Sequence, residues 1–348
     1  INFLIIYLFS EDGYGLFAKS YLSSLTLAGF FLSSVDPALY KNSLNNEDFS
    51  IVFSQSIIQK FIYGTVYFIV CLLLNIDLIF VFLAFFASIG FPLFFRVYEK
   101  FNSYLNILIS VNLLFLLCFC VLVYLDLTEN YYVELLLFKF LTLFVLQFFY
   151  LFKTFKIKIK GIWSFNIINN IAISSKVIPL TLVNNIILPS LSNSDAGIYK
   201  IVLDFSKYSK LFLTPLYHQL MVKFKFSFRK NLERGDLSIL FTFFNLLFLF
   251  FSSLILIIIY TRYGISYFDE YLILSIFVCY FLYRIKITND TSFIFTNFKI
   301  KNIFFILFLN LLVLLLCLLS TIYFTNFISC FLILLLFDAA LIFFLKIK

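Results

Sequence analysis

The residues best suited to chemistry lie between Ser192 and Leu220, where a polar turn leads into an apolar segment of membrane-spanning length. Lys200, Asp204 and Lys207 are spaced so that they share one face of a helix, and Lys210 lies at the edge of that face. Placing an ionised side chain at the centre of a bilayer costs about 3 kcal/mol. The excess of lysines over Asp204 favours a water-filled cavity that receives an anion. The alternative is structural, with Asp204 paired to a lysine to hold two helices together.

Other polar residues lie at similar depth. Lys176 is near the middle of a segment that is rich in asparagine and serine and that Pro179 is expected to bend or weaken. Lys139 and Asp338 lie about halfway along the last apolar segment of each half of the chain, which makes them candidates for coupling transport to an ion gradient. Either one can instead pair with a polar neighbour. His218, the one histidine, is a further candidate as a proton relay.

Catalytic and metal-binding motifs are absent from the sequence. There is no Walker A motif, no zinc-ligand spacing and no nucleophile elbow. The cysteines lie inside apolar segments without paired spacing, as expected for small buried side chains. We therefore expect no enzyme activity, no cofactor and no metal.

The composition predicts the fold class, because 63% of the residues are hydrophobic, 13% are charged and the mean hydropathy is +1.05. These values indicate a polytopic, all-α membrane protein. A window of about 20 residues predicts twelve spans, at 1–9, 16–36, 57–76, 77–95, 104–125, 132–152, 162–189, 197–221, 237–260, 267–288, 302–324 and 325–345. The first is too short to cross a bilayer, so we expect its beginning to be missing.

Lysine and arginine side chains indicate the orientation of these spans. They collect in alternate loops, while the opposite loops contain Arg262 alone and are otherwise acidic or neutral. Positive loops face the cytoplasm, so both termini are predicted to be cytoplasmic. The net charge of +8 is then explained by topology rather than by nucleic-acid binding. The loops are too short to contain a soluble domain.

An internal repeat indicates that the chain is built twice. The turn and helix of SNSDAGIYKIVLDFSKYSKLFLTPL resemble SEDGYGLFAKSYLSS, with Ser192 at the place of Ser10, an offset of 182 residues (192 minus 10). We therefore predict an N-terminal six-helix bundle over 1–152, a basic cytoplasmic linker over 153–161 and a C-terminal six-helix bundle over 162–348.

These two motifs, the two six-helix halves and the basic cytoplasmic loops resemble the polysaccharide-exporter branch of the multidrug/oligosaccharidyl-lipid/polysaccharide (MOP, MATE-like) superfamily. Its best-known members are flippases of O-antigen or lipid-linked oligosaccharide in the cytoplasmic (inner) membrane. The resemblance implies two halves around a central cationic cavity that opens alternately to each side. It also implies a polyprenyl-diphosphate-linked oligosaccharide as substrate, a polysaccharide polymerase and other assembly proteins as partners, and a monomeric transporter in the bilayer.

Carried over to this sequence, the resemblance places helices 16–36, 162–189 and 197–221 along the cavity. It implies a set of diphosphate ligands with Asp204 as their organiser: Lys176, Lys200, Lys207, Lys210 and, more weakly because it can snorkel, Lys19. The sequence has lysines where arginines would grip a diphosphate in bidentate fashion.

Three other functions fit parts of the pattern. A multidrug exporter of the same superfamily carries cations and needs an acidic cavity, which the excess of lysine disfavours. A membrane polysaccharide polymerase needs a large outer loop or a clustered acid and base, and the adjacent Asp269 and Glu270 point about 100° apart on a helix. A purely structural membrane protein leaves the deep lysines unexplained.

Overall fold

The structure is a computed structural model that describes residues 2–32, 35, 49–90, 101–154, 174–212, 234–264, 270–295, 300–323 and 326–346. Every element in this part of the chain is a helix and none is a strand. The predicted all-α class is therefore confirmed. His218 and the linker after residue 154 lie outside the described residues.

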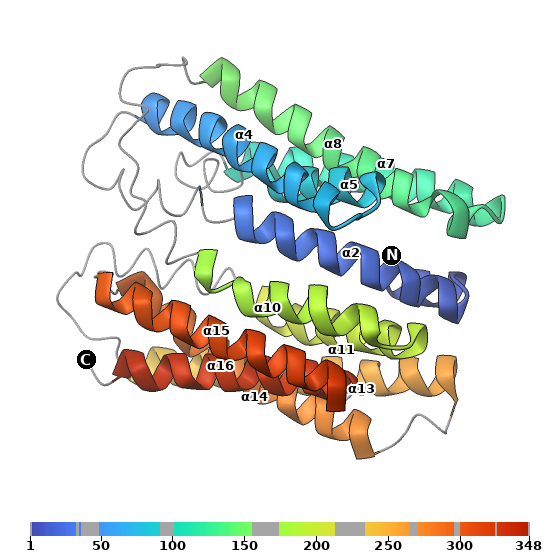
Figure 1. The fold of residues 1–348 in the computed structure, drawn as a ribbon. Helices are drawn as coiled ribbons and strands as arrows, with labels where there is room; N and C mark the ends of the chain where they lie inside the picture. The colour runs from blue at the N-terminus through green and yellow to red at the C-terminus, as the bar shows by residue number, and fades with distance from the viewer. Residues whose placement is uncertain are drawn as a thin grey trace. The chain divides into compact units, whose positions relative to one another are not determined.

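The helices follow the order of the predicted spans (Figure 1). The first half contributes α1 (Asn2–Leu8), α2 (Glu11–Leu32), α4 (Phe49–Leu73), α5 (Leu78–Ser88), α7 (Phe101–Tyr124) and α8 (Thr128–Thr154). The second contributes α10 (Ile178–Leu182), the π-helix η1 (Val183–Ile187), the 3₁₀-helix η2 (Leu188–Ser190), α11 (Asn193–Phe212), α13 (Arg234–Tyr263), α14 (Glu270–Phe295), α15 (Ile300–Tyr323) and α16 (Phe327–Lys346). Each predicted span overlaps one of these helices.

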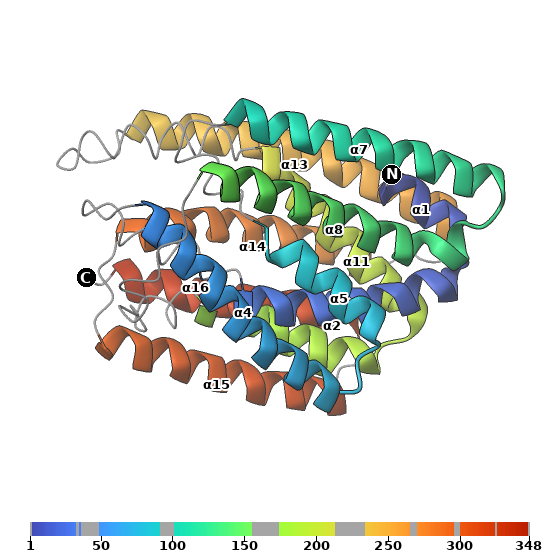
Figure 2. The same ribbon diagram turned by 90° about the horizontal axis from the view of Figure 1, so that it is seen from above.

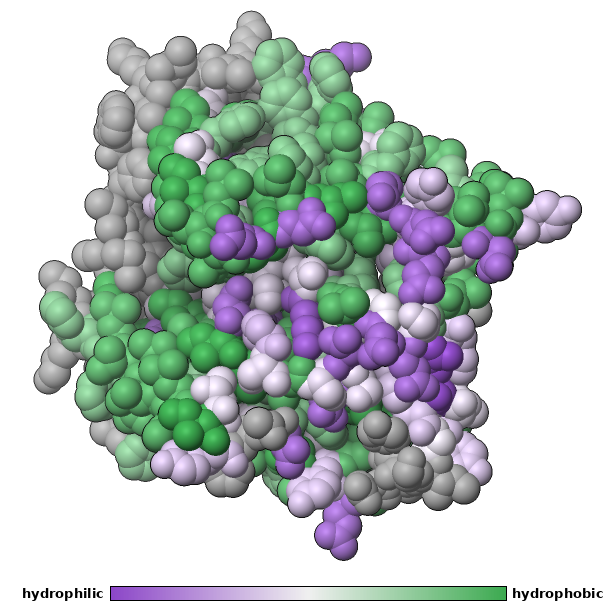
Figure 3. Space-filling model, turned by 45° about the vertical axis from the view of Figure 1, so that its right-hand side comes forward, coloured by the Kyte–Doolittle hydropathy of each residue, from purple (hydrophilic) through white to green (hydrophobic). Residues whose placement is uncertain are grey.

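Length and apolar composition identify the helices that can cross a bilayer. Within the described residues, six stretches meet both requirements: Glu11–Leu32, Phe53–Leu73, Asn102–Tyr124, Thr128–Lys153, Thr242–Tyr263 and Ile303–Tyr323. Leu78–Ser88, Ile178–Ser190 and Phe327–Phe343 are shorter apolar helices. Hydrophobic residues also cover much of the coloured surface in Figure 3. The chain is therefore a membrane-embedded helical protein, whereas twelve complete crossings remain a prediction.

The chain packs as two compact units. Unit 1 contains Ile1–Asn185 and Phe298–Leu314, and unit 2 contains Ile186–Asn297 and Leu315–Lys348. In unit 1, α2 packs against α4, α5 and α10, and α8 packs against α5 and α7 (Figures 1 and 2). In unit 2, α11 packs against α13, α14 and α16, and α14 packs against α13 and α16.

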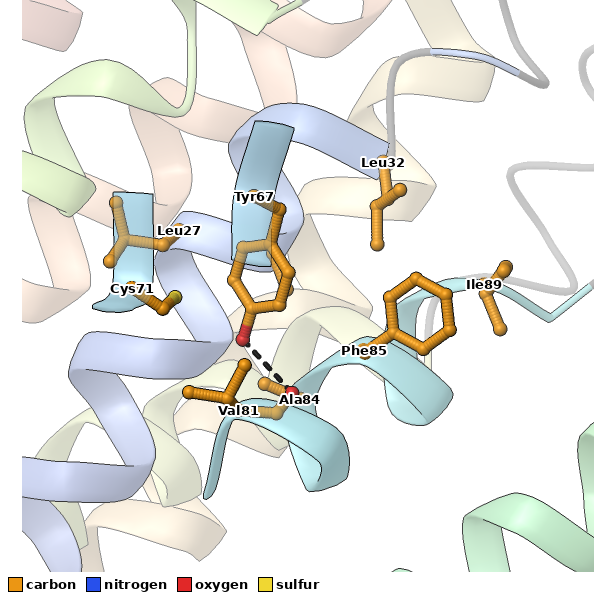
Figure 4. Packing of buried hydrophobic residues seen from close by; sticks show 9 residues of the cluster. Leu27, Leu32, Tyr67, Cys71, Val81, Ala84, Phe85 and Ile89 are labelled. Carbon is orange, nitrogen blue, oxygen red and sulfur yellow. Dashed lines mark hydrogen bonds between the residues drawn. The ribbon is translucent and has the colours of Figure 1, made fainter. Parts of the chain in front are cut away.

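The core of unit 1 lies where α4 and α5 meet α2. Its buried residues are Leu27, Ala28, Leu32, Tyr67, Cys71, Val81, Ala84, Phe85 and Ile89 (Figure 4). The Tyr67 hydroxyl donates to the main-chain oxygen of Val81 at 3.1 Å. A tyrosine buried in an apolar core needs such a partner, and here the bond ties α4 to α5.

Two predicted spans are interrupted in the structure. The helix predicted over 77–95 ends at Ser88 in α5, just before Gly90 and Pro92 in the sequence. The helix predicted over 162–189 has a turn at Lys176 and Val177, with Pro179 in the first turn of α10, and then continues as η1 and η2. The expected weakening at Pro179 is confirmed.

Candidate functional site

The repeated motif forms the same helix start in both copies. Ser10 Oγ accepts from the N–H of Gly13 at 3.1 Å, and Ser192 Oγ accepts from the N–H of Asp195 at 3.1 Å. Both serines are N-caps, which satisfy a backbone donor at the start of α2 and of α11. The two caps are separated by the 182-residue offset of the repeat (192 minus 10).

Each capping serine also donates to a carboxylate, but the carboxylate has a different source in each copy. Ser192 donates to Asp195 within α11 at 2.7 Å. Ser10 donates to Glu129 at the start of α8, also at 2.7 Å. Gly13 occupies the repeat position of Asp195, and a Cβ at Gly13 would lie 2.1 Å from Glu129 Oε1. The glycine therefore leaves room for Glu129 to take the place of the local aspartate.

Along α11, Lys200 and Asp204 form an ion pair. The Lys200 side chain is 6% exposed and the Asp204 side chain 21% exposed. The two residues therefore lie one turn apart on the same helix. The carboxylate of Asp204 balances the charge of the buried Lys200 ammonium group. Lys207 is exposed on the same helix, whereas the side chain of Lys210 is outside the described residues. Of the two α11 lysines whose side chains are described, Lys200 is buried and Lys207 is exposed.

A second ion pair lies in unit 2, between α14 and α16. Lys286 Nζ is 4.0 Å from Asp338 Oδ2, and the two side chains are 26% and 10% exposed. Asp338, predicted as a coupling residue, is therefore paired with a polar neighbour, the alternative that the sequence allowed. Its partner Lys286 lies inside α14. In the sequence, an aspartate deep inside an apolar span indicates that a cationic side chain lies beside it, because an unpaired charge there is costly.

Tyr283 links two of the helices that carry these pairs. It is buried on α14, and its hydroxyl donates to the main-chain oxygen of Leu203 on α11 at 3.4 Å. Unit 2 thus contains two ion pairs, Lys200–Asp204 and Lys286–Asp338, and in each pair the two charges balance.

Lys139 on α8 is half-buried, and its ammonium group lies 4.5 Å from the centre of the Phe115 ring. A cation over an aromatic face is stabilised electrostatically, by up to about 2 kcal/mol when water is excluded. This contact gives Lys139 a structural partner on α7. Its role in coupling remains a prediction.

Lys19 on α2 and Lys176 at the turn before α10 are both half-buried and belong to unit 1. The two helices are joined by polar contacts. Ser23 Oγ donates to the main-chain oxygen of Asn184 at 2.8 Å, and Thr181 Oγ1 donates to that of Thr26 at 3.2 Å. The first bond satisfies a carbonyl group of η1, where the regular helix ladder is broken, and the second joins a side chain of α10 to the main chain of α2.

The chemistry available here is electrostatic. Within the described residues, no group of three histidine, cysteine, aspartate or glutamate side chains is placed to hold a metal ion. The described part of unit 2 combines two largely buried ion pairs with the exposed Lys207 on α11.

The helices and their interior charges define a class, the polytopic helical membrane proteins with polar residues at membrane depth. No family model matches the chain, and no curated protein or solved structure matches it either.

Proposed function

We propose that this protein is a membrane transporter that flips a polyprenyl-diphosphate-linked oligosaccharide, such as an O-antigen repeat unit, across the cytoplasmic membrane by alternating access. The single observation that carries the proposal is the exposed Lys207 on α11, next to the turn that carries the balanced pair Lys200–Asp204. Lys207 is the fifteenth residue of α11, about 20 Å along the helix. A charged side chain at that depth is stabilised by contact with water or an anion and is costly in contact with lipid.

The packing within each unit supports the two-bundle architecture of this proposal. In unit 1 the helix after the first cap, α2, packs against α4 and α5, and α5 packs against α8. In unit 2 the helix after the second cap, α11, packs against α13 and α14, and α14 packs against α16. These neighbours therefore recur in the same chain order, whereas the packing of α7 against α8 has no counterpart of similar extent between α15 and α16. Together with the matched caps, this recurrence supports two copies of one six-helix plan.

A cation exporter of the same superfamily is the main rival. Such a protein needs carboxylates that are free to bind a cation. Asp204 is paired with Lys200 and Asp338 with Lys286, so each of these carboxylates already has a cation beside it. This pairing disfavours a cationic substrate.

The proposal is tested by replacing the lysines of α11 in cells that depend on this transporter for surface polysaccharide. We expect Lys207→Ala and Lys210→Ala to reduce surface polysaccharide at least tenfold with normal protein abundance, and Lys207→Arg to retain part of it because charge and reach are kept. Lys153→Ala, an exposed lysine at the end of α8, is the matched control and should have no effect. Normal polysaccharide in an abundant Lys207→Ala/Lys210→Ala protein would remove the reason for assigning this site.

A structural role for Lys207 gives a different result. If Lys207 served mainly to balance Asp204, Lys207→Ala would lower protein abundance, and Asp204→Asn in the same chain would restore it. Measuring abundance and polysaccharide for Lys207→Ala/Asp204→Asn separates the two roles.

A further inference from the structure

The helix α5 is too short to cross a bilayer by itself. It has 11 residues, about 16 Å of helix, whereas the hydrocarbon core of a bilayer is about 30 Å thick. It begins at the N-cap Asp77, whose carboxylate accepts from the N–H of Ile79 at 3.2 Å. At its other end the last carbonyl groups have no partner within the helix. Such groups need a donor from elsewhere when water is absent.

Lys60 supplies that donor from the neighbouring helix α4. Its ammonium group donates to the main-chain oxygens of Ile89 at 3.1 Å and Gly90 at 2.9 Å. Lys60 is 1% exposed, and it is the one charged residue in the apolar stretch Phe53–Leu73. A buried ammonium is costly unless it is fully hydrogen-bonded, and the end of a helix carries a partial negative charge that favours a cation. The lysine and the helix end therefore stabilise each other.

The remaining contacts show that α4 and α5 fit along their length. Tyr67 lies two turns beyond Lys60 on α4. Its hydroxyl donates to the main-chain oxygen of Val81, which lies nearer the start of α5 than Ile89 does. Between these anchors a Cβ at Gly64 would lie 2.7 Å from the ring of Phe85, so the glycine permits close approach. The two helices run antiparallel, and Figure 4 shows the Tyr67 side chain pointing from α4 toward Val81 on α5.

The geometry points to a built-in cation site at the end of α5, formed by the main-chain oxygens of Ile89 and Gly90 and filled by the ammonium group of Lys60. Lys60 is thus a positioning residue that fixes where α5 ends and how it packs against α2 and α8. Its importance for transport rests on the proposed function, because α2 carries Lys19 and belongs to the helices assigned to the transport path. Its effect on α5 is independent of that assignment.

Burial distinguishes this role from that of a substrate ligand. Lys207 is exposed on its helix, whereas Lys60 is enclosed and two of its donors are held by carbonyl groups. An anionic substrate could reach Lys60 only by displacing the end of α5.

The test is amide hydrogen exchange of the purified protein in lipid nanodiscs, read over residues 85–90 and compared with α7. Lys60→Met should accelerate exchange over 85–90 at least tenfold, since two charge-assisted hydrogen bonds are lost, while exchange in α7 stays unchanged. Lys60→Arg should restore most of the protection. Lys153→Met, which replaces an exposed lysine, should change neither segment.

Chemical rescue tests the same site without depending on the size of a new side chain. In Lys60→Ala, added propylammonium should restore part of the protection over 85–90, because it brings both a charge and N–H donors. Tetramethylammonium has the charge but no N–H group and should not restore it. Failure of propylammonium together with unchanged exchange in Lys60→Met would overturn the assignment.

Transport assays of the same variants separate this inference from the proposed function. Loss of transport in Lys60→Met with protection over 85–90 intact would contradict a positioning role and point to contact with substrate. If Lys60→Met accelerates local exchange but the unaltered protein transports no diphosphate-linked sugar, the cation site stands and the proposed function fails.

Discussion

The interior lysines of this protein have four different kinds of partner. Lys200 meets a carboxylate in its own helix, Lys286 a carboxylate on another helix, Lys139 an aromatic ring and Lys60 two main-chain oxygens. Each arrangement lowers the cost of a charge at membrane depth by a different route. Replacing them should therefore have different consequences, although all four are lysines in apolar helices.

Lys200→Ala strands the carboxylate of Asp204 without its partner. Breaking a buried pair from one side costs about 3 kcal/mol or more, so we expect a marked fall in the thermal unfolding temperature in detergent. Lys200→Ala/Asp204→Asn should recover most of the loss, because no unpaired charge remains. Lys286→Ala is the comparison and should cost less, since its pair is longer and its side chain more exposed. Equal losses in Lys200→Ala and the double variant would show that the pair contributes no coupling energy.

Sequence spacing predicted some of these partners and not others. The pairing of Lys200 with Asp204 was predictable because residues four apart on a helix are neighbours. The pairings of Lys286 with Asp338 and of Lys60 with the end of α5 join residues of different helices, and hydropathy carries no information on them. Lys60 falls inside the predicted span 57–76, and the structure places it inside α4, buried. Its partners could not be predicted from its position in that apolar run.

At the scale of elements, apolar runs predicted where helices occur but not where each one ends. The end of α5 receives a donor from α4, and the irregular segment η1 receives one from the side chain of Ser23 on α2. The capping serines, by contrast, were visible as a repeated sequence motif. Their geometry follows from local chemistry, whereas interrupted helices depend on tertiary partners.

The two caps use carboxylates from different sources, so the local aspartate of the second copy should be able to replace Glu129 in the first. Glu129→Ala removes the carboxylate that holds Ser10 and should destabilise the start of α2 by about 1 kcal/mol. Adding Gly13→Asp places an aspartate where the second copy has Asp195 and should restore the loss. In the presence of Glu129, Gly13→Asp should instead destabilise, because its Cβ lies 2.1 Å from Glu129 Oε1 and two carboxylates then compete. Thermal unfolding of the three variants checks this, and the absence of rescue by Gly13→Asp would contradict equivalent caps.

Two helical glycines form a matched pair for testing the contact between α4 and α5. Gly64→Ala places a methyl group 2.7 Å from the buried ring of Phe85 and should destabilise by about 1–3 kcal/mol through overpacking. Gly29→Ala meets Val177 at 3.7 Å, an ordinary contact, and should be neutral or slightly stabilising because alanine favours helix. Phe85→Leu in the Gly64→Ala chain should recover part of the loss. Equal unfolding temperatures for the two single variants would contradict the close packing of these helices.

At the scale of the whole molecule, the distribution of charged loops predicts the orientation in the membrane. In a cysteine-free background, cysteines at Asn130 and Asn193 should react with an impermeant maleimide added outside the cell, and cysteines at Ser227 and Asn297 should react only after permeabilisation. Asn130 and Asn193 lie in the first turns of α8 and α11, which places both labels beside the repeated caps. Labelling of Ser227→Cys from outside intact cells would reverse the predicted orientation.

The central claim is that this membrane protein recognises the diphosphate of a lipid-linked sugar through the lysines of α11. The most direct measurement is transfer across proteoliposomes, read as the fraction of lipid-linked oligosaccharide that an added glycosidase can reach. We predict transfer of the polyprenyl-diphosphate-linked sugar, little transfer of a neutral glycolipid with the same sugar chain, and at least a tenfold loss with Lys207→Ala/Lys210→Ala. Equal transfer of the charged and neutral lipids, or undiminished transfer by the double variant, would contradict the claim.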